Sequence, residues 1–369
     1  MNANEILAQY HFDGRIVDVS PLGNGNVNDT YLAVVRNTFD ETQLVLQRIN
    51  TNVFKNPEAV MRNMRTVTDH CHKKLQREIN STDRVWQMPK LIPTRNGSDF
   101  VKDENGNYWR VITRILSASS FDTAQSTDHA RECGAALGHF HYLVSDLNPE
   151  LLEDPLPGFH NTLGYLESFD KTVAENPIAK ERLSKRLEAR SLSVFVNERR
   201  DLAAFFANAE KSGAIKRHMF HGDPKVNNIM IDNFTGLGTA MIDLDTVSPG
   251  LVQIDFGDAI RSICNPAGEE TENLNAVKFD ETLFTAFCQG YISEAEAFLS
   301  PAEKSSLYEA VRLLPFELGL RFFQDYLAGD KYFKTTKPGQ NLNRAMVQFR
   351  LCEEIEAHEL KIRRLLKSL

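Results

Sequence analysis

The residues most capable of chemistry lie in the middle of the chain, where acidic and amide side chains follow one another at short intervals. The segment 221–228 reads HGDPKVNN, and the segment 239–246 reads TAMIDLDT. Turn-forming residues separate two apolar runs here, which predicts a β-hairpin with Asp223 and Asn228 before it and Asp243 at its far end. Carboxylate and amide oxygens suit Mg²⁺, so the pattern predicts a magnesium site.

A simpler interpretation is also open at this point. Asp, Asn and Gly are frequent in turns for reasons unrelated to catalysis, and Asp243 could act only as a cap at the end of a strand. The spacing of twenty residues between Asp223 and Asp243, and the apolar residues 240–242 before the second one, favour the catalytic interpretation.

These segments resemble the catalytic loop and metal-binding aspartate of the protein-kinase-like small-molecule kinases, the aminoglycoside and choline kinase group. The shared motifs are H-G-D-x-K-x-x-N at 221–228 and I-D-x-D at 242–245. The resemblance implies an enzyme, a phosphotransferase with an alcohol group as acceptor. It implies that Asp223 is the catalytic base and that Lys225 is a catalytic charge partner for the phosphate in transfer.

The same resemblance implies the two cofactors, ATP and Mg²⁺. Asn228 and Asp243 correspond to the metal ligands of related kinases. Asp245 follows two residues later and is expected to contact metal or substrate.

A polar turn near the N-terminus could lie over the nucleotide phosphates. It consists of Gly23, Asn24, Gly25 and Asn26, whose backbone N–H groups would be the donors. It is not a Walker A loop, because no G-K-[ST] follows and the next element is a strand rather than a helix. An ordinary hairpin turn is the alternative.

The strand over residues 44–49 should offer the cation that holds the α- and β-phosphates. Kinases usually have lysine there, whereas this chain has Gln47 in the inward position and Arg48 beside it. A shift of one residue would reverse the two side chains, so either could contact the nucleotide. Glu58 and Asp69 on the following helix are the candidates for an acidic partner.

Other chemically suggestive residues receive structural roles. His139 and His141 are two residues apart on a predicted helix and point in different directions, so they cannot share a metal ion. Asp255 begins an apparent D-F-G motif, but it lies too far beyond Asp243 and within a helical pattern. We expect Asp255 and Asp258 to support the catalytic loop.

A closer resemblance narrows the group to the bacterial N-acetylhexosamine 1-kinases. The matching motifs are LGNGNVNDT, LQRIN, VFKNP, IDLDTV and ELGLRFFQDYL, and the resemblance extends over residues 15–360. It implies transfer of the γ-phosphate of ATP to the anomeric hydroxyl of N-acetylglucosamine or N-acetylgalactosamine, and Q-R at 47–48 is the pattern of this subgroup. Two alternatives remain: a kinase for choline, an amino alcohol or an aminoglycoside, and a pseudokinase that only binds.

The acceptor is expected on the helical segment 315–330. At 3.6 residues per turn Arg321 and Asp325 share one face and Tyr326 lies on the adjacent one, so polar and aromatic groups are presented together. The alternative is a surface ion pair between Arg321 and Asp325 above a stripe of core residues.

The elements that must position these residues change in type along the chain. β-type runs occupy residues 31–35, 44–49 and 108–115, and long amphipathic helical patterns follow residue 117. This predicts an α+β, protein-kinase-like fold with a strand-rich nucleotide-binding lobe over residues 1–116 and a helical catalytic and acceptor-binding lobe over 117–369.

Composition limits the setting of this chemistry. The chain has 369 residues, a formal charge of −8 and five cysteines without a C-x-x-C pair. Nucleic acid is therefore disfavoured as a partner, and a reducing cytoplasm is the expected location. The sequence has no signal-peptide pattern and no long apolar stretch, so we expect no membrane partner. The expected partner is a small-molecule hydroxyl acceptor, an amino sugar according to the resemblance. We expect a monomer or a homodimer.

Overall fold

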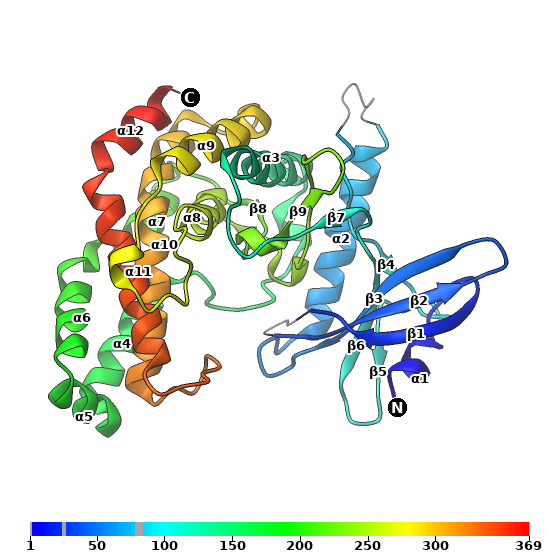
Figure 1. The fold of residues 1–369 in the computed structure, drawn as a ribbon, viewed down its shortest axis with the longest axis horizontal. Helices are drawn as coiled ribbons and strands as arrows, with labels where there is room; N and C mark the ends of the chain where they lie inside the picture. The colour runs from blue at the N-terminus through cyan, green and yellow to red at the C-terminus, as the bar shows by residue number, and fades with distance from the viewer. Residues whose placement is uncertain (1, 24–26, 78–83, 369) are drawn as a thin grey trace.

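The protein is described by a computed structural model that covers residues 2–23, 27–77 and 84–368. Figure 1 shows a strand-rich N-terminal lobe in blue and a larger body of helices in green to red, with short strands between them. This is the protein-kinase-like α+β architecture that the order of strand and helix patterns predicts.

The N-terminal lobe is built on one antiparallel sheet in the order β1-β2-β3-β6-β4, with β5 paired to β6. Its strands are β1 (Arg15–Pro21), β2 (Asp29–Arg36), β3 (Glu41–Ile49), β4 (Leu91–Ile92), β5 (Val101–Lys102) and β6 (Tyr108–Thr113).

Because strand side chains alternate, the sheet has two distinct faces. On one face Leu44, Leu46 and Trp109 pack with residues of α1 (Ala3–Leu7). The other face lies toward α2 (Pro57–Leu75), where Ile49 packs against Val60 and Met61.

The catalytic segment forms two small sheets beside the first lobe. β8 (His218–Phe220) pairs with β11 (Ser248–Gly250). β9 (Ile229–Asp232) pairs with β10 (Gly238–Met241) as a hairpin, and β7 (Ala118–Ser119) joins β9. The hairpin predicted from the sequence is confirmed.

Helices surround these strands and bury most of the core. The central helix is α10 (Pro301–Ala328), which begins at a capping box between Ser300 and Glu303. The remaining helices are α3 (Thr127–Val144), α4 (Thr162–Glu175), α5 (Pro177–Lys185), α6 (Leu187–Glu198), α7 (Phe205–Lys211), α8 (Val252–Ile263), α9 (Glu281–Ala295), α11 (Gln340–Ala357) and α12 (Glu359–Ser368). Short 3₁₀ turns include η3 (Val226–Asn228) and η4 (Leu244–Thr246).

Several elements are absent from the sequence predictions, among them β1 and α4. β1 is an edge strand with an irregular register near Ile16 and several exposed residues, so it carries little alternation. The sequence pattern predicts one C-terminal helix over about residues 342–367, whereas the structure has two helices, α11 and α12, separated at His358. No helix in the described ranges is both long and apolar enough to cross a bilayer.

Candidate functional site

The catalytic loop follows β8 in the chain and is hydrogen-bonded to a residue of α8. The buried carboxylate of Asp255 accepts hydrogen bonds from the backbone N–H of His221 at 2.6 Å and of Gly222 at 2.8 Å. Its Oδ2 also contacts His141 Nε2 at 2.8 Å. Asp255 therefore supports the loop from within a helix, as predicted, and does not face the metal site.

His221 fixes the two halves of the site to each other. Its Nδ1 accepts the backbone N–H of Asp223 at 3.2 Å, and its Nε2 lies 2.9 Å from the carbonyl of Ile242. Burial lowers the pKa of His221, which keeps the ring neutral as this pattern of one acceptor and one donor requires. The ring thus joins the catalytic loop to the residue before Asp243.

Gly222 is required by the path of the loop. Its φ is +86°, in the left-handed region, and a Cβ here would lie 2.9 Å from both the Cβ and the carbonyl oxygen of Thr246. The hydroxyl of Thr246 donates to the carbonyl of His221 at 2.8 Å. The loop and the segment after Asp243 are therefore in direct contact.

Asp223 lies between a cation and an amide. Lys225 Nζ is 2.6 Å from Asp223 Oδ2, and Asn228 Nδ2 donates to the Asp223 carbonyl at 2.8 Å and to Oδ2 at 3.3 Å. Burial opposes the charged form of Lys225, but the charges of Asp223 and Asp243 outweigh it and raise its pKa. The ammonium therefore stays charged beside the carboxylate.

Asp243 is a carboxylate without a hydrogen-bond or ion-pair partner in the described part of the chain. Its backbone adopts φ 63° and ψ 57°, a left-handed conformation that Asp tolerates better than most residues. The protein atoms around the Asp243 carboxyl reduce its solvation, and this, together with the negative charges of Asp245 and Asp223, raises the pKa of Asp243 to about 7. Lys225 and Arg110 oppose this rise.

This arrangement fits a divalent cation. The backbone N–H of Ile242 donates to the carbonyl of Asn228 at 2.9 Å, so Asn228 and Asp243 are held side by side. The Asp243 carboxylate has no ion-pair partner among the described residues, and it is an oxygen ligand of the kind that Mg²⁺ prefers. Within the described ranges no three His, Cys, Asp or Glu side chains form a metal cage, so water and phosphate oxygens would complete the coordination.

Asp245 is buried and contacts the N-terminal lobe. Asn28 Nδ2 donates to Asp245 Oδ2 at 2.6 Å, and Arg110 on β6 forms an ion pair with Asp245 Oδ1. Asn28 Oδ1 also accepts the backbone N–H of Asn50 at 3.0 Å. Asp245 therefore connects the catalytic segment to the sheet.

The inward position of β3 is occupied by Gln47, as predicted, but its amide holds a cation from the next strand. Arg110 Nε and Nη2 donate to Gln47 Oε1 at 2.9 and 2.7 Å. Arg48 points to the opposite face, where it forms an ion pair with Asp29 and lies over the Trp109 ring. The position of Arg48 thus argues against its predicted contact with phosphate.

The predicted acidic partners on α2 have other contacts. Glu58 lies 3.3 Å from the Tyr108 hydroxyl, and Asp69 lies 3.7 Å from Arg65. Sequence reasoning missed Arg110 altogether. The available signal was a charged residue in the middle of an otherwise apolar strand.

The predicted phosphate turn is only partly described. Gly23 has φ +69°, which favours glycine in a tight turn, whereas Asn24, Gly25 and Asn26 lie outside the described residues. Its role remains a prediction.

Comparison with known proteins agrees with this geometry. Residues 18–298 match the phosphotransferase enzyme family that includes the aminoglycoside phosphotransferases. The chain belongs to this family. The matched region contains the N-terminal sheet apart from the first three residues of β1, and every residue of the catalytic segment described above.

Solved structures show the same fold for this phosphotransferase at low sequence identity. A microcompartment-associated aminopropanol kinase is 16% identical, with a TM-score of 0.62 and coverage of 98% of each chain. An aminoglycoside phosphotransferase from Alicyclobacillus acidocaldarius is 15% identical, with a TM-score of 0.60 and coverage of 100% of this chain and 97% of the other. A choline kinase from Cryptosporidium parvum is 14% identical, with a TM-score of 0.59 and coverage of 93% and 90%.

On α10 in the helical lobe, Arg321 lies among aromatic rings. Its guanidinium carbon is 5.2 to 5.8 Å from the ring centroids of Phe159, Tyr165, Tyr332 and Phe333. Within the described residues Arg321 forms no hydrogen bond or ion pair. Its five N–H donors are therefore available to a ligand.

Asp325 and Tyr326 do not join Arg321. The Asp325 carboxylate accepts backbone N–H groups of Lys331 and Tyr332 at 2.9 and 2.8 Å, together with Phe333 N–H at 3.0 Å and the Asn341 amide at 3.0 Å. The Tyr326 ring is buried beneath the Arg182 guanidinium, 4.3 Å from its centroid. These two residues hold the loop after α10, and the alternative interpretation, an ion pair between Arg321 and Asp325, is not formed among the described residues.

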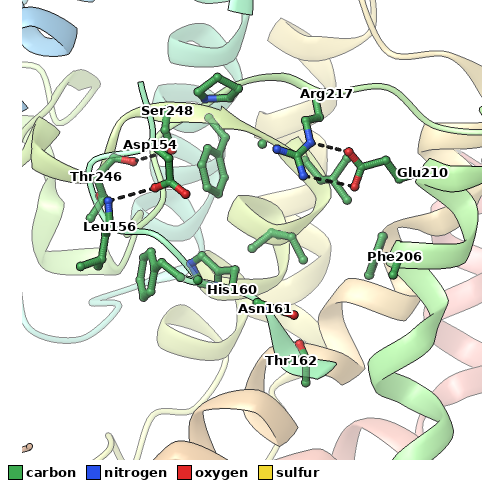
Figure 2. A pocket seen from close by; sticks show the side chains of 18 of the residues that line it. Asp154, Leu156, His160, Asn161, Thr162, Phe206, Glu210, Arg217, Thr246 and Ser248 are labelled. Atoms are coloured by element: carbon green, nitrogen blue, oxygen red, sulfur yellow. Dashed lines mark hydrogen bonds and ion pairs between the residues drawn. The ribbon is translucent and has the colours of Figure 1, made fainter. Parts of the chain in front are cut away.

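A cavity of about 420 Å³ lies beside the end of β8 and the segment after Asp243, with Phe220, Thr246 and Ser248 among its lining residues. Figure 2 shows His160 and Thr246 on its wall, with the paired Arg217 and Glu210 farther along. His160 Nε2 is 2.9 Å from the Gly222 carbonyl. Phe159 lines the cavity and also contacts Arg321, so it connects the two regions.

The two helix histidines have separate structural partners, as predicted. His139 Nδ1 lies 3.0 Å from Glu294, and the ring stacks on Trp86 at 3.8 Å. His141 Nδ1 lies 2.9 Å from the Tyr291 hydroxyl.

Proposed function

We propose that this phosphotransferase transfers the γ-phosphate of ATP to the anomeric hydroxyl of an N-acetylhexosamine, with Mg²⁺ as the metal. Family membership and the catalytic geometry support the transfer of a phosphoryl group. The match of five sequence motifs to N-acetylhexosamine 1-kinases supports the acceptor.

The chain's own residues divide the reaction among them. Asp223 orients the acceptor hydroxyl and accepts its proton, while the hydroxyl oxygen forms a bond to the γ-phosphorus and the bond to the β-phosphate oxygen breaks to release ADP. Lys225 holds Asp223 in place and carries positive charge next to the transferred group. Asn228 and Asp243 would hold Mg²⁺, which offsets the negative charge of the phosphates.

The contacts of Arg321 are the observation that carries the choice of acceptor. Aromatic rings around a cation-sized space are the usual recognition site for choline and similar ammonium groups. Here the protein's own guanidinium occupies the centre of four rings. A cationic acceptor would meet a like charge there, whereas a neutral sugar finds hydrogen-bond donors and apolar ring faces.

The cavity that Phe159 lines also suits a sugar. The cavity of about 420 Å³ falls in the range of small-molecule sites. Because Phe159 belongs both to the cavity and to the group around Arg321, we place the acceptor between them, next to the loop that carries Asp223.

A panel of acceptors tests the proposal. The protein is incubated with MgATP and N-acetylglucosamine, N-acetylgalactosamine, glucose, choline, 1-amino-2-propanol or an aminoglycoside, and ADP release is measured. We expect release with the N-acetylhexosamines and a product phosphorus resonance coupled to the anomeric proton. A 6-phosphate, or turnover of the cationic acceptors alone, would contradict the proposed acceptor but leave the phosphotransferase intact.

Arg321→Ala tests the acceptor site directly. Removing its donors should raise the KM for the sugar several-fold and leave the KM for ATP unchanged. Tyr326→Phe is the matched control, since it removes only a hydroxyl from a ring packed under Arg182. Equal effects of Arg321→Ala on both KM values would show that Arg321 only stabilises the fold.

A further inference from the structure

We propose that Arg110 supplies the cation that orients the nucleotide phosphates, the task that a lysine of strand β3 has in protein kinases. The inference rests on the proposed function and assigns this role to the strand next to β3. It replaces the sequence prediction that Gln47 or Arg48 contacts the phosphates.

Arg110 is held in one orientation. Its side chain is 1% exposed, and Gln47 Oε1 accepts hydrogen bonds from both Nε and Nη2. Gln47 Nε2 in turn donates to Thr30 Oγ1 at 3.2 Å, which fixes the amide with its oxygen toward Arg110. The guanidinium is thus positioned before any ligand binds, so little rotamer freedom remains to be lost.

The charge of Arg110 is only partly compensated. Asp245 pairs with one edge of the guanidinium, but Asn28 also donates to this carboxylate at 2.6 Å. Arg110 Nη1 is buried and has no hydrogen-bond partner among the described residues. An unpaired buried donor is rare in native proteins, and a phosphate oxygen is the acceptor that a guanidinium matches best.

The location of Arg110 connects both parts of the nucleotide site. Arg110 on β6 lies directly opposite Gln47 on β3, and Gln47 occupies the position that is a lysine in most kinases. The ion-pair partner of Arg110, Asp245, lies two residues after Asp243, the expected metal ligand. Arg110 therefore lies between the sheet that should cover the nucleotide and the residues that should hold its metal.

Asp245 takes the place of the acidic partner that kinases provide from the helix after β3. Glu58 and Asp69 on α2 have other contacts, whereas Asp245 comes from the catalytic segment itself. The ion pair therefore joins the two lobes and holds Arg110 toward the site where the phosphates would lie.

Nucleotide binding tests the inference without any acceptor. Titration calorimetry with ADP plus Mg²⁺ is performed on the wild-type protein, Arg110→Met, Arg110→Lys and Arg36→Met. We expect Arg110→Met to raise the Kd by roughly 10- to 100-fold, the range for one hydrogen bond to a charged group. Arg110→Lys should recover part of this loss. Arg36→Met removes an exposed arginine paired with Glu41 and should change the Kd less than about twofold.

A purely structural role would give a different result. The inference would be overturned if Arg110→Met and Arg110→Lys both kept the wild-type Kd for ADP. It would also be overturned if Arg48→Met raised this Kd more than Arg110→Met does. In either case the proposed function would stand. If Arg110→Met fails to fold, Gln47→Met provides a second test, because it keeps the Arg110 cation but removes the amide oxygen that orients it. An unchanged Kd for ADP in Gln47→Met would also overturn the inference. Failure of the wild-type protein to bind ADP would overturn the proposed function and this inference together.

Discussion

Replacement of Asp223 by Asn removes the proton acceptor and keeps the shape of the loop. The carboxylate lies 2.6 Å from Lys225 Nζ and 3.3 Å from Asn228 Nδ2. An amide oxygen at the same place can accept these two hydrogen bonds, and the backbone hydrogen bond from Asp223 N–H to His221 is unaffected. The change therefore acts on chemistry more than on structure.

The expected magnitude follows from the role assigned to Asp223. A positioned general base contributes about 10²- to 10⁴-fold to the rate, which corresponds to about 2.7 to 5.5 kcal/mol in the activation barrier. Asp223→Asn should lower kcat by this factor. Because the proposed nucleotide contacts are made by other residues, the Kd for ADP with Mg²⁺ should stay within about twofold.

The assay compares initial rates of ADP release at saturating MgATP and sugar, with calorimetry for the nucleotide. Asp232→Asn is the matched control, since it makes the same chemical change at the end of β9. Among the described residues Asp232 Oδ1 accepts hydrogen bonds from Phe234 N–H, Thr235 N–H and the Thr235 hydroxyl, all in its own turn, and an amide oxygen can do the same.

A kcat within about threefold of wild type for Asp223→Asn, with an unchanged melting temperature, would refute the assignment of Asp223 as base. Loss of nucleotide binding in the same variant would show instead that Asp223 shapes the metal site.

Three further predictions follow from the same contacts. Asp243→Ala should abolish activity that raised Mg²⁺ does not restore, and full activity of the wild type in EDTA would contradict this. Gly222→Ala places a Cβ 2.9 Å from Thr246 at φ +86°, so it should cost about 1–3 kcal/mol in urea unfolding and reduce turnover, and a neutral effect would show that the loop can move aside. Burial opposes the charged form of His160, but the negative charge of Glu317 outweighs burial and raises the pKa of His160, while the pKa of Glu317 is lowered. The charged pair therefore stabilises the fold at pH values below the raised pKa of His160 and above the lowered pKa of Glu317. His160→Gln should lower the free energy of unfolding more at about pH 6 than at about pH 9, and an equal loss at both pH values would contradict the pairing.

Local patterns predicted most of the elements. The β-type runs expected at residues 31–35, 44–49 and 108–115 correspond to β2, β3 and β6, and α3 is the first of the long helices expected after residue 117. The missed helix α4 ends at Asn176, which also caps α5 before Pro177. This Asn-Pro pair indicates a helix boundary in the sequence, so the residues before it could have been assigned to a separate helix.

Breaks within helices were harder to predict. The pattern over residues 342–367 is continuous in the sequence, yet the chain leaves the helix at His358, whose φ is −102° and ψ is 7°. Packing against α9 and α10 decides such a break, because Phe279 and Glu281 contact His358 and Arg363 reaches Glu309. Propensity within a window does not contain these contacts.

The sequence by itself determined the catalytic segment, because its parts are local. Asp223 and Asn228 precede one short hairpin and Asp243 follows it, and strand alternation was enough to point Gln47 inward. Only the tertiary structure decided which cation Gln47 holds and what surrounds Arg321. Arg110 meets Asp245 across the lobes, and four rings from separate segments converge on one guanidinium. Periodicity fixes the face on which a side chain lies, whereas its partner depends on how distant elements pack.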